Sequence, residues 1–172
     1  SLMRYFYTIT INRNNTNYGT VSSSSVIVPN NSTTYSTTGN TLKLSDGRTV
    51  TATATAATGY TTTFSSWTPT SGTVNAATTV TANFTRTANP YTVTYNFVEN
   101  GGKSATKTSA TVNYGSAIDL SPTAAKDGYT FVGWNTNKDA TTKLNSLNMG
   151  AGNVTLYAIY SKTLTGTFYY WD

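Results

Sequence analysis

The sequence predicts a mainly β protein with little helix, arranged as two tandem modules. Apolar and polar residues alternate with a period of two along much of the chain, as they do in half-buried strands. No run of about 12 residues has the 3.6-residue period of an amphipathic helix. Threonine, which favours the pleated surface of a sheet, accounts for 39 of the 172 residues. Aromatic residues reach 13% and the net charge is only +5, so the composition does not favour disorder.

Strand-like segments fill the first half of the chain. Tyr5–Ile11 is a strand by alternation and β-propensity and stops at an asparagine-rich cluster. Asp46-Gly47 separates two shorter segments and predicts a tight hairpin, because this dipeptide tolerates positive φ. The predicted strands are residues 5–11, 21–28, 42–44, 50–55, 64–67 and 80–85.

A break in the pattern at Ala88-Asn89-Pro90 divides the chain. Proline donates no ladder hydrogen bond and biases the preceding residue toward extended geometry. We therefore expect a joint between one module at residues 3–88 and a second at residues 89–162, with residues 163–172 as a tail or the start of a further repeat. In the second module we expect strands at residues 91–98, 106–114, 129–134 and 154–160, a turn at Gly101-Gly102 and at most one helical turn within residues 141–149.

The two halves resemble each other, which indicates an internal repeat. The matching pairs are residues 7–12 with 91–96, Gly59-Tyr60-Thr61 with Gly128-Tyr129-Thr130, and residues 80–84 with 154–158. Their offsets of 84, 69 and 74 residues differ, so we interpret the halves as diverged copies with loops of different length.

Five segments of the second half follow one another in the order of a known family. They are Tyr91–Tyr95, Gly101-Gly102, Val112–Gly115, Asp127–Trp134 and Val154–Ala158. With them, residues 90–162 resemble the internalin B-repeat, also called the Listeria–Bacteroides repeat. Residues 4–88 resemble a divergent copy, which lacks the glycine before its tryptophan and has an extra hairpin. The resemblance implies small β-grasp, ubiquitin-like modules in tandem on bacterial cell-surface proteins, adhesins among them, with no established catalytic residue.

The composition excludes much enzyme chemistry. The chain contains no Cys and no His, which removes thiolate and Ser-His-Asp nucleophiles and imidazole metal ligands. Its six acidic residues are scattered and form neither a recognisable carboxylate pair nor the alternating acids of a calcium loop. We therefore expect no catalytic residue, no metal and no cofactor.

The basic residues are isolated along the chain. Residues 1–88 carry five basic residues against one acidic residue, and residues 89–172 carry six against five. Nucleic-acid binding needs clustered Lys and Arg, so we expect no nucleic-acid partner, while weak attraction to an anionic cell-wall polymer stays open. No run of about 20 apolar residues predicts a transmembrane segment. Ser1-Leu2 before Met3 indicates an excised piece of a longer protein.

Two groups of residues are candidate site residues. The family-motif residues should be structural, because buried aromatic side chains would anchor a thin β module, although an aromatic platform for sugar stacking is the alternative. The tail aromatics are candidate interaction residues and read as the opening strand of a next repeat, because exposed apolar clusters mark contact sites. The motif residues are Gly128, Tyr129, Phe131, Gly133, Trp134, Tyr60, Phe64 and Trp67, and the tail residues are Phe168, Tyr169, Tyr170 and Trp171.

These features predict a tandem repeat module of an extracellular protein of the bacterial cell surface or cell wall. It would act as a stalk, a spacer or an adhesive surface and not as an enzyme. Expected partners are neighbouring repeats of the same chain, and host or cell-wall glycans or proteins. The alternative is a ligand-binding module for carbohydrate or anionic cell-wall polymer, with exposed Tyr, Trp and Lys side chains as contacts.

Overall fold

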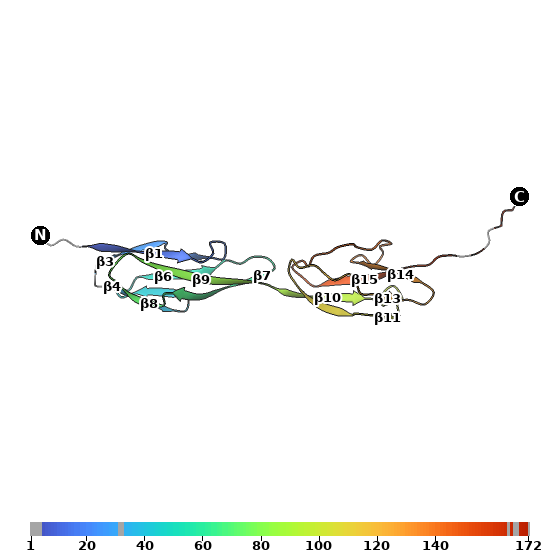
Figure 1. Cartoon of the computed structure of the whole chain (residues 1–172), viewed down its shortest axis with the longest axis horizontal. Helices are drawn as coiled ribbons and strands as arrows, with labels where there is room; N and C mark the ends of the chain where they lie inside the picture. The colour runs from blue at the N-terminus through green and yellow to red at the C-terminus, as the bar shows by residue number, and fades with distance from the viewer. Residues whose placement is uncertain (1–4, 31–32, 165, 167–168, 172) are drawn as a thin grey trace. The chain divides into compact units, whose positions relative to one another are not determined.

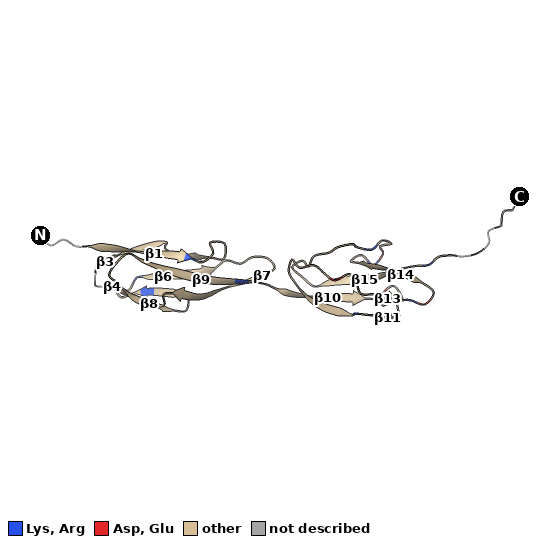
Figure 2. Ribbon diagram, viewed as in Figure 1, with Lys and Arg blue, Asp and Glu red and all other residues tan. Residues whose placement is uncertain are grey.

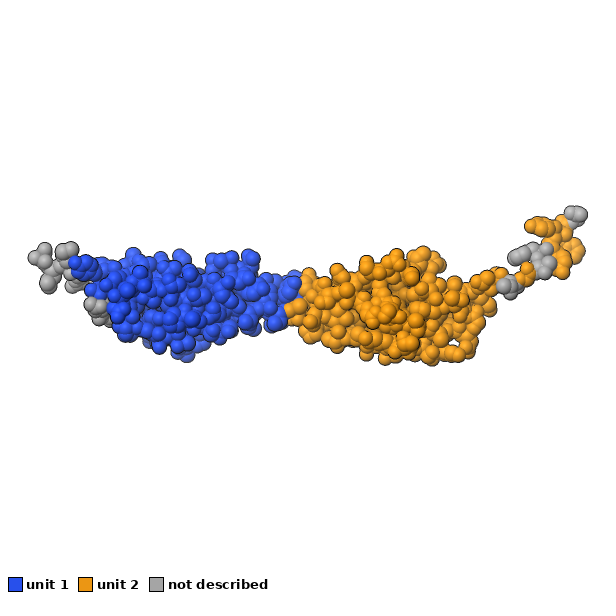
Figure 3. Space-filling view, viewed as in Figure 1, with its two compact units in different colours: residues 1–87 blue, residues 88–172 orange. Residues whose placement is uncertain are grey.

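The computed structural model describes residues 5–30, 33–164, 166 and 169–171. The chain forms two compact units, unit 1 at residues 1–87 and unit 2 at residues 88–172 (Figures 1 and 3). Every regular element of the described residues is a strand, which confirms the predicted mainly β class. No helix in this part of the chain is long and apolar enough to cross a membrane.

Unit 1 contains a four-stranded sheet in the order β3-β1-β9-β7. Its strands are β1 (Phe6–Arg13), β3 (Ser25–Pro29), β7 (Tyr60–Thr68) and β9 (Thr78–Ala88). Strand β1 is antiparallel to β3 and parallel to β9. The first and last strands of unit 1 therefore lie side by side at the centre of the sheet.

A second, five-stranded sheet completes unit 1 in the order β2-β6-β5-β4-β8. Its strands are β2 (Gly19–Val21), β4 (Thr33–Thr38), β5 (Thr41–Leu44), β6 (Thr49–Ala54) and β8 (Ser71–Val74). The β5–β6 hairpin turns at Gly47 with φ 94°, as the Asp-Gly pair predicts. One buried cluster joins the two sheets and includes Ile9, Val80 and Phe84 from the first and Leu42, Leu44 and Val50 from the second.

Unit 2 contains a four-stranded sheet in the order β12-β10-β15-β14. Its strands are β10 (Pro90–Asn96), β12 (Ser109–Asn113), β14 (Thr130–Asn135) and β15 (Val154–Ser161). The two-stranded pair of β11 (Ser104–Ala105) and β13 (Ala124–Ala125), together with irregular segments, takes the place of a second large sheet. The core combines Val93, Tyr95 and Leu156 of the sheet with Ile118, Ala124 and Met149 of these segments.

The two four-stranded sheets have the same strand order, and their central pairs have the same directions. Ile9 lies opposite Val26 in the antiparallel β1–β3 pair, and the residues 84 positions later, Val93 and Ala110, lie opposite each other in the antiparallel β10–β12 pair.

The last strands of the two units match at a different offset. Ile11 lies opposite Val80 and Tyr95 lies opposite Leu156, so β9 and β15 correspond at an offset of 76 residues. The offset of 74 predicted from the sequence is wrong by two residues. A slip of two residues keeps every side chain on the same face of a strand, so alternation alone does not reveal it.

The helical turn expected within residues 141–149 is absent. These residues form bends, and Asn148 makes an isolated antiparallel bridge with Ala117. The backbone N–H of Leu144 donates to the carbonyl oxygen of Trp134 at 2.8 Å, so this segment bonds to β14 rather than to itself. Its threonine and asparagine residues also have low helix propensity. The β-grasp detail of the prediction is not confirmed, because the described residues contain no helix on either sheet.

Candidate functional site

Both motif tryptophans are buried in the cores of their units. Trp134 is 1% exposed, and its indole N–H donates to the carbonyl oxygen of Pro122 at 2.7 Å. Its ring makes an edge-to-face contact with Phe131 at a centroid distance of 5.4 Å. Trp67 is 3% exposed and packs against Phe64 at 5.5 Å. Because neither indole face is open to solvent, a sugar-stacking platform would need other aromatic residues.

Gly133 lets a loop pass close to β14. A β-carbon at residue 133 would collide with the side chain of Lys143, and the backbone there has φ 155°. Residues 141–145, here called the strap, run along β14, where Leu144 bonds to the backbone of Trp134. Strand β14 is at the edge of its sheet, and open edges promote pairing with other chains. The strap therefore covers part of this edge, and the lack of a β-carbon at Gly133 leaves room for Lys143.

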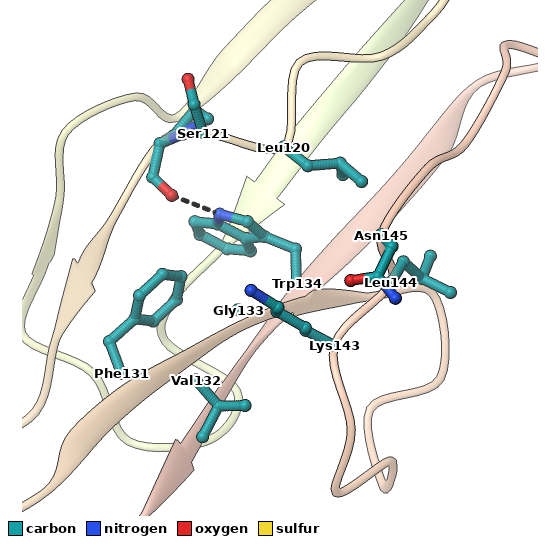
Figure 4. Close-up of a pocket in the computed structure, with 10 residues that line it drawn as sticks. Leu120, Ser121, Phe131, Val132, Gly133, Trp134, Lys143, Leu144 and Asn145 are labelled. Atoms are coloured by element: carbon teal, nitrogen blue, oxygen red, sulfur yellow. Dashed lines mark hydrogen bonds between the residues drawn. The ribbon is translucent and has the colours of Figure 1, made fainter.

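A pocket of about 250 Å³ lies beside Trp134 (Figure 4). Its walls include Leu120, Phe131 and, from the strap, Lys143 and Asn145. Lys143 supplies the charge in this lining. A lone ammonium without a carboxylate makes no acid–base pair, so the pocket holds no catalytic arrangement.

The two motif tyrosines stay at the surface. Tyr60 is 40% exposed and Tyr129 is 41% exposed. Each follows a glycine of positive φ, Gly59 at 81° and Gly128 at 79°. The N–H of each tyrosine closes its turn onto the carbonyl oxygen three residues earlier at 3.1 Å. The same turn therefore presents one tyrosine in each unit.

Positive side chains lie over these tyrosine rings. The Lys126 ammonium is 4.1 Å and the Lys162 ammonium 5.3 Å from the centroid of Tyr129. In unit 1 the Arg86 guanidinium is 5.8 Å from the centroid of Tyr60. At the offset of 76 residues Arg86 corresponds to Lys162, so both units place a cation on the equivalent tyrosine, an attractive arrangement worth about 0.5–1 kcal/mol at exposed sites.

Arg86 makes three hydrogen bonds within unit 1. It donates to the hydroxyl oxygen of Thr62 at 2.8 Å and to the backbone oxygens of Asn17 at 3.2 Å and Thr55 at 2.9 Å. Its guanidinium also lies 4.6 Å from the ring of Tyr18. The arginine therefore ties three segments of unit 1 together and has a structural role.

The lysines of unit 2 are more open. Lys126 donates to the backbone oxygen of Asn100 at 2.8 Å. Lys162 makes its ring contact with Tyr129 and has no ion pair or hydrogen bond within the described part of the chain. Charged residues are otherwise sparse over both units (Figure 2). These two lysines were not singled out from the sequence, although aligning the two copies at the correct offset would have matched Lys162 with Arg86.

The carboxylates of the described residues lie in turns. Asp119 accepts hydrogen bonds from the hydroxyl and the N–H of Ser121 at 2.6 and 2.9 Å, and these bonds lower its pKa. Hydrogen bonding from Arg48 lowers the pKa of Asp46 in the same way. A general acid requires a raised pKa, so neither carboxyl is suited to that work. Within residues 5–30 and 33–164 no three His, Cys, Asp or Glu gather as a metal site would need.

The described tail aromatics are highly exposed. Tyr169 is 79% exposed, and Tyr170 and Trp171 are each 95% exposed. Phe168, the fourth predicted interaction residue of the tail, lies outside the described residues.

Comparison with known proteins finds a family match within the second unit. Residues 91–159 match the family described as the Listeria-Bacteroides repeat domain. A relative, Internalin H of Listeria monocytogenes serovar 1/2a (strain ATCC BAA-679 / EGD-e), is 40% identical over 78 residues, which are 44% of this chain and 13% of that protein. The chain thus matches only a small part of that relative's length. The resemblance predicted for residues 90–162 is confirmed, because the family model matches residues 91–159 within unit 2.

Proposed function

We propose that the chain is a repeat module of a bacterial surface or secreted protein and acts there as a load-bearing spacer. The Listeria-Bacteroides repeat and the similarity to an internalin support placement in a surface protein. The same similarities support a non-catalytic role. We also infer that unit 1 is a divergent copy of the repeat, because its four-stranded sheet, its turn before Tyr60 and its buried Trp67 match those of unit 2.

The parallel pairing of the first and last strands carries the proposal of a spacer. Residues 9–13 of β1 lie beside residues 78–82 of β9, and residues 93–96 of β10 lie beside residues 154–157 of β15. Tension on the two ends of a unit pulls these neighbouring strands in opposite directions along their axes. All hydrogen bonds of the ladder then bear the load together instead of breaking one after another. A unit connected in this way resists stretching.

Neighbouring repeats are the proposed partners within the chain. Strand β9 ends at Ala88 and β10 begins at Pro90, so one residue separates the last strand of unit 1 from the first strand of unit 2. A load therefore passes from one parallel pair to the next without a long linker. The proposed module boundaries remain residues 3–88 and 89–162, with residues 163–172 as a tail or the start of a further repeat.

Single-molecule stretching of the whole chain tests the spacer. We expect two unfolding events, one for each unit, with contour-length gains of roughly 250–300 Å each, since an extended residue spans about 3.6 Å. Forced unfolding reports the unfolding rate. The chain contains no cysteine, so introduced cysteines provide unique attachment points.

The matched control changes only the direction of the load. Phe6 and Pro29 lie opposite each other at one end of the antiparallel β1–β3 pair, where the chain enters β1 and leaves β3. Handles on Phe6→Cys and Pro29→Cys open unit 1 one hydrogen-bonded pair at a time, so we expect a several-fold lower force than between the chain ends. Equal forces in the two geometries would contradict the proposal.

The alternative function, a ligand-binding module, is favoured by one local feature, the open lysines around Tyr129.

A further inference from the structure

We propose that unit 2 binds an acidic polysaccharide through a surface formed by Lys126, Tyr129, Tyr160 and Lys162, here called the Tyr129 surface. This site goes beyond a spacer role and is independent of the resistance of the units to force. The two lysines would contact carboxylate or sulfate groups, and the exposed part of the Tyr129 ring would contact a sugar ring.

The Tyr129 surface concentrates positive charge on an exposed aromatic ring. Both lysine ammoniums lie within 5.3 Å of the Tyr129 centroid, and the Lys126 ammonium is also 5.7 Å from the centroid of Tyr160. Tyr129 keeps 41% of its surface exposed. An acidic sugar offers an anionic group and an apolar ring face next to each other, which fits this combination of ammoniums and aromatic ring.

Neither lysine is neutralised by a carboxylate within the described residues. The ion pairs of unit 2 are Lys103 with Asp127 at 2.7 Å and Lys138 with Glu99 at 3.8 Å. Asp127 follows Lys126 in the chain, but its carboxylate is held by Lys103. Lys126 uses one of its donors on a backbone oxygen, which leaves two ammonium donors for a ligand.

A pocket of about 250 Å³ continues the Tyr129 surface. Lys126 and Tyr160 line it together with Asn100, Lys138 and Ile159. A second sugar of a polymer would fit there, with the Lys126 ammonium at the edge of the pocket, whereas Lys138 is already paired with Glu99. The surface and the pocket thus share Lys126 and Tyr160, so a polymer bound at Tyr129 would extend toward the pocket.

In unit 1 the equivalent cation, Arg86, is held by hydrogen bonds within the unit. Arg86 stands where Lys162 stands in unit 2, but its Nε and Nη2 groups already bond to Thr62, Asn17 and Thr55. Tyr18 also contacts the guanidinium. A ligand would reach only the Nη1 group of Arg86 without replacing these internal bonds, so we place binding on unit 2. This difference makes the location of binding a part of the test.

Binding is measured with the whole chain. Heparin supplies a sulfated polysaccharide and polygalacturonate a carboxylated one, and titrations at increasing salt distinguish specific contacts from general attraction. We expect one or both to bind at low salt. In two-dimensional NMR spectra, the largest shifts should fall on residues 126–129 and 158–162, with unit 1 unchanged.

Matched variants distinguish binding by the lysines of the Tyr129 surface from a general effect of net charge on affinity. The double variant Lys126→Ala with Lys162→Ala should lose about tenfold in affinity, because two cationic contacts are removed. The control double variant Lys43→Ala with Lys107→Ala has the same net charge and changes two exposed lysines outside the surface, so we expect less than about a twofold loss. Lys126→Arg with Lys162→Arg should retain binding. Melting curves verify that each variant is folded.

Three outcomes would overturn the proposal. They are no binding of either polysaccharide at low salt, an equal loss in the control variant, and chemical shifts centred on unit 1. Binding of a polyglycerol phosphate polymer in place of both polysaccharides would also overturn it, because such a polymer has no sugar ring in its backbone to contact Tyr129.

Discussion

The two units build the same four-stranded sheet and complete it in different ways. Unit 1 places the core residues Leu42 and Leu44 on strands of a second sheet, whereas unit 2 supplies Ile118 and Met149 from irregular segments. The central parallel pair and the antiparallel strand beside it keep the same register in both units. The sheet therefore defines the repeat, and the layer that packs on it is where the two copies diverge.

Truncating the buried tryptophans should give the largest effect on both units. Trp134→Ala should destabilise unit 2, and Trp67→Ala unit 1, by about 3–5 kcal/mol each, as cavities left by large aromatic residues do. Urea unfolding of the whole chain, followed by NMR signals from each unit, measures the two free energies separately. An unchanged unit 2 transition in Trp134→Ala would contradict its role in the core.

Gly133 should be less tolerant than the other motif glycine, Gly128. Gly133→Ala meets Lys143 and an unfavourable φ, whereas Gly128→Ala meets open space and only the unfavourable φ of 79°. We expect a loss of about 2–3 kcal/mol for Gly133→Ala and about 1 kcal/mol for Gly128→Ala.

A second substitution shows whether the strap causes this difference. Lys143→Gly removes the β-carbon that Gly133→Ala would meet, so combining the two should recover part of the loss in a double-mutant cycle. Strictly additive losses would show that the strap does not require the glycine. Urea unfolding of unit 2 in the whole chain supplies all four free energies.

Replacing each buried tryptophan by phenylalanine should destabilise the two units to different extents. The indole N–H of Trp134 bonds to Pro122, whereas the buried indole N–H of Trp67 has no hydrogen-bond partner among the described residues. Trp134→Phe leaves a buried carbonyl oxygen unpaired, while Trp67→Phe removes an unpaired donor. We expect Trp134→Phe to lose about 1–2 kcal/mol more than Trp67→Phe. Equal losses in the two units would show that Trp67 has a partner, such as bound water.

Alkaline pH should lower the folding stability of unit 2 more than that of unit 1. Burial raises the pKa of Tyr95 and Tyr160 in unit 2, and the charge of Asp119 raises that of Tyr95 further. In unit 1 burial raises the pKa of Tyr35. Because the unfolded chain releases these protons first, the stabilisation is complete below the unfolded tyrosine pKa of about 10 and is lost as the pH rises through the higher folded values.

The melting of each unit from pH 8 to 11 measures this effect. Methyl NMR signals of Ile9 for unit 1 and Leu156 for unit 2 follow the two units in one sample. Tyr95→Phe loses the hydrogen bond to the Asp119 carbonyl oxygen at 2.5 Å but should reduce the alkaline loss of unit 2. A larger alkaline loss in unit 1 would contradict the assignment.

The strands and the repeat were easier to predict from the sequence than the layer that packs on the four-stranded sheet of each unit. Alternation located the central strands, and Asp46-Gly47 located its hairpin. The same alternation aligned Val80 with Val154 instead of Leu156. A slip of two residues keeps each side chain on the same face of the sheet, so alternation does not reveal it. The helical turn predicted within residues 141–149 is wrong, because the backbone N–H of Leu144 in the strap bonds to Trp134. A partner so far away in the sequence leaves no local periodic pattern from which the bond could be predicted.

The candidate surface was predicted only in part. The Gly-Tyr motif identified Tyr60 and Tyr129, because a glycine of positive φ closes the same local turn in both units. The cations over their rings come from other segments, and their burial and bonding depend on tertiary contacts. Isolated lysines in a sequence do not show whether each is paired, so the difference between Arg86 and Lys162 required the structure.

Removing residues 163–172 should have the smallest effect. Strand β9 continues through one residue into the next sheet, whereas β15 ends at Ser161 and the described aromatic residues beyond it are at least 79% exposed. Because they contribute little burial to unit 2, truncation after Lys162 should change its melting temperature by less than about 1 °C, and the ring contact between Lys162 and Tyr129 should persist. A drop of several degrees would show that the tail packs on unit 2, which would add a further layer to its core and narrow the difference between the two units.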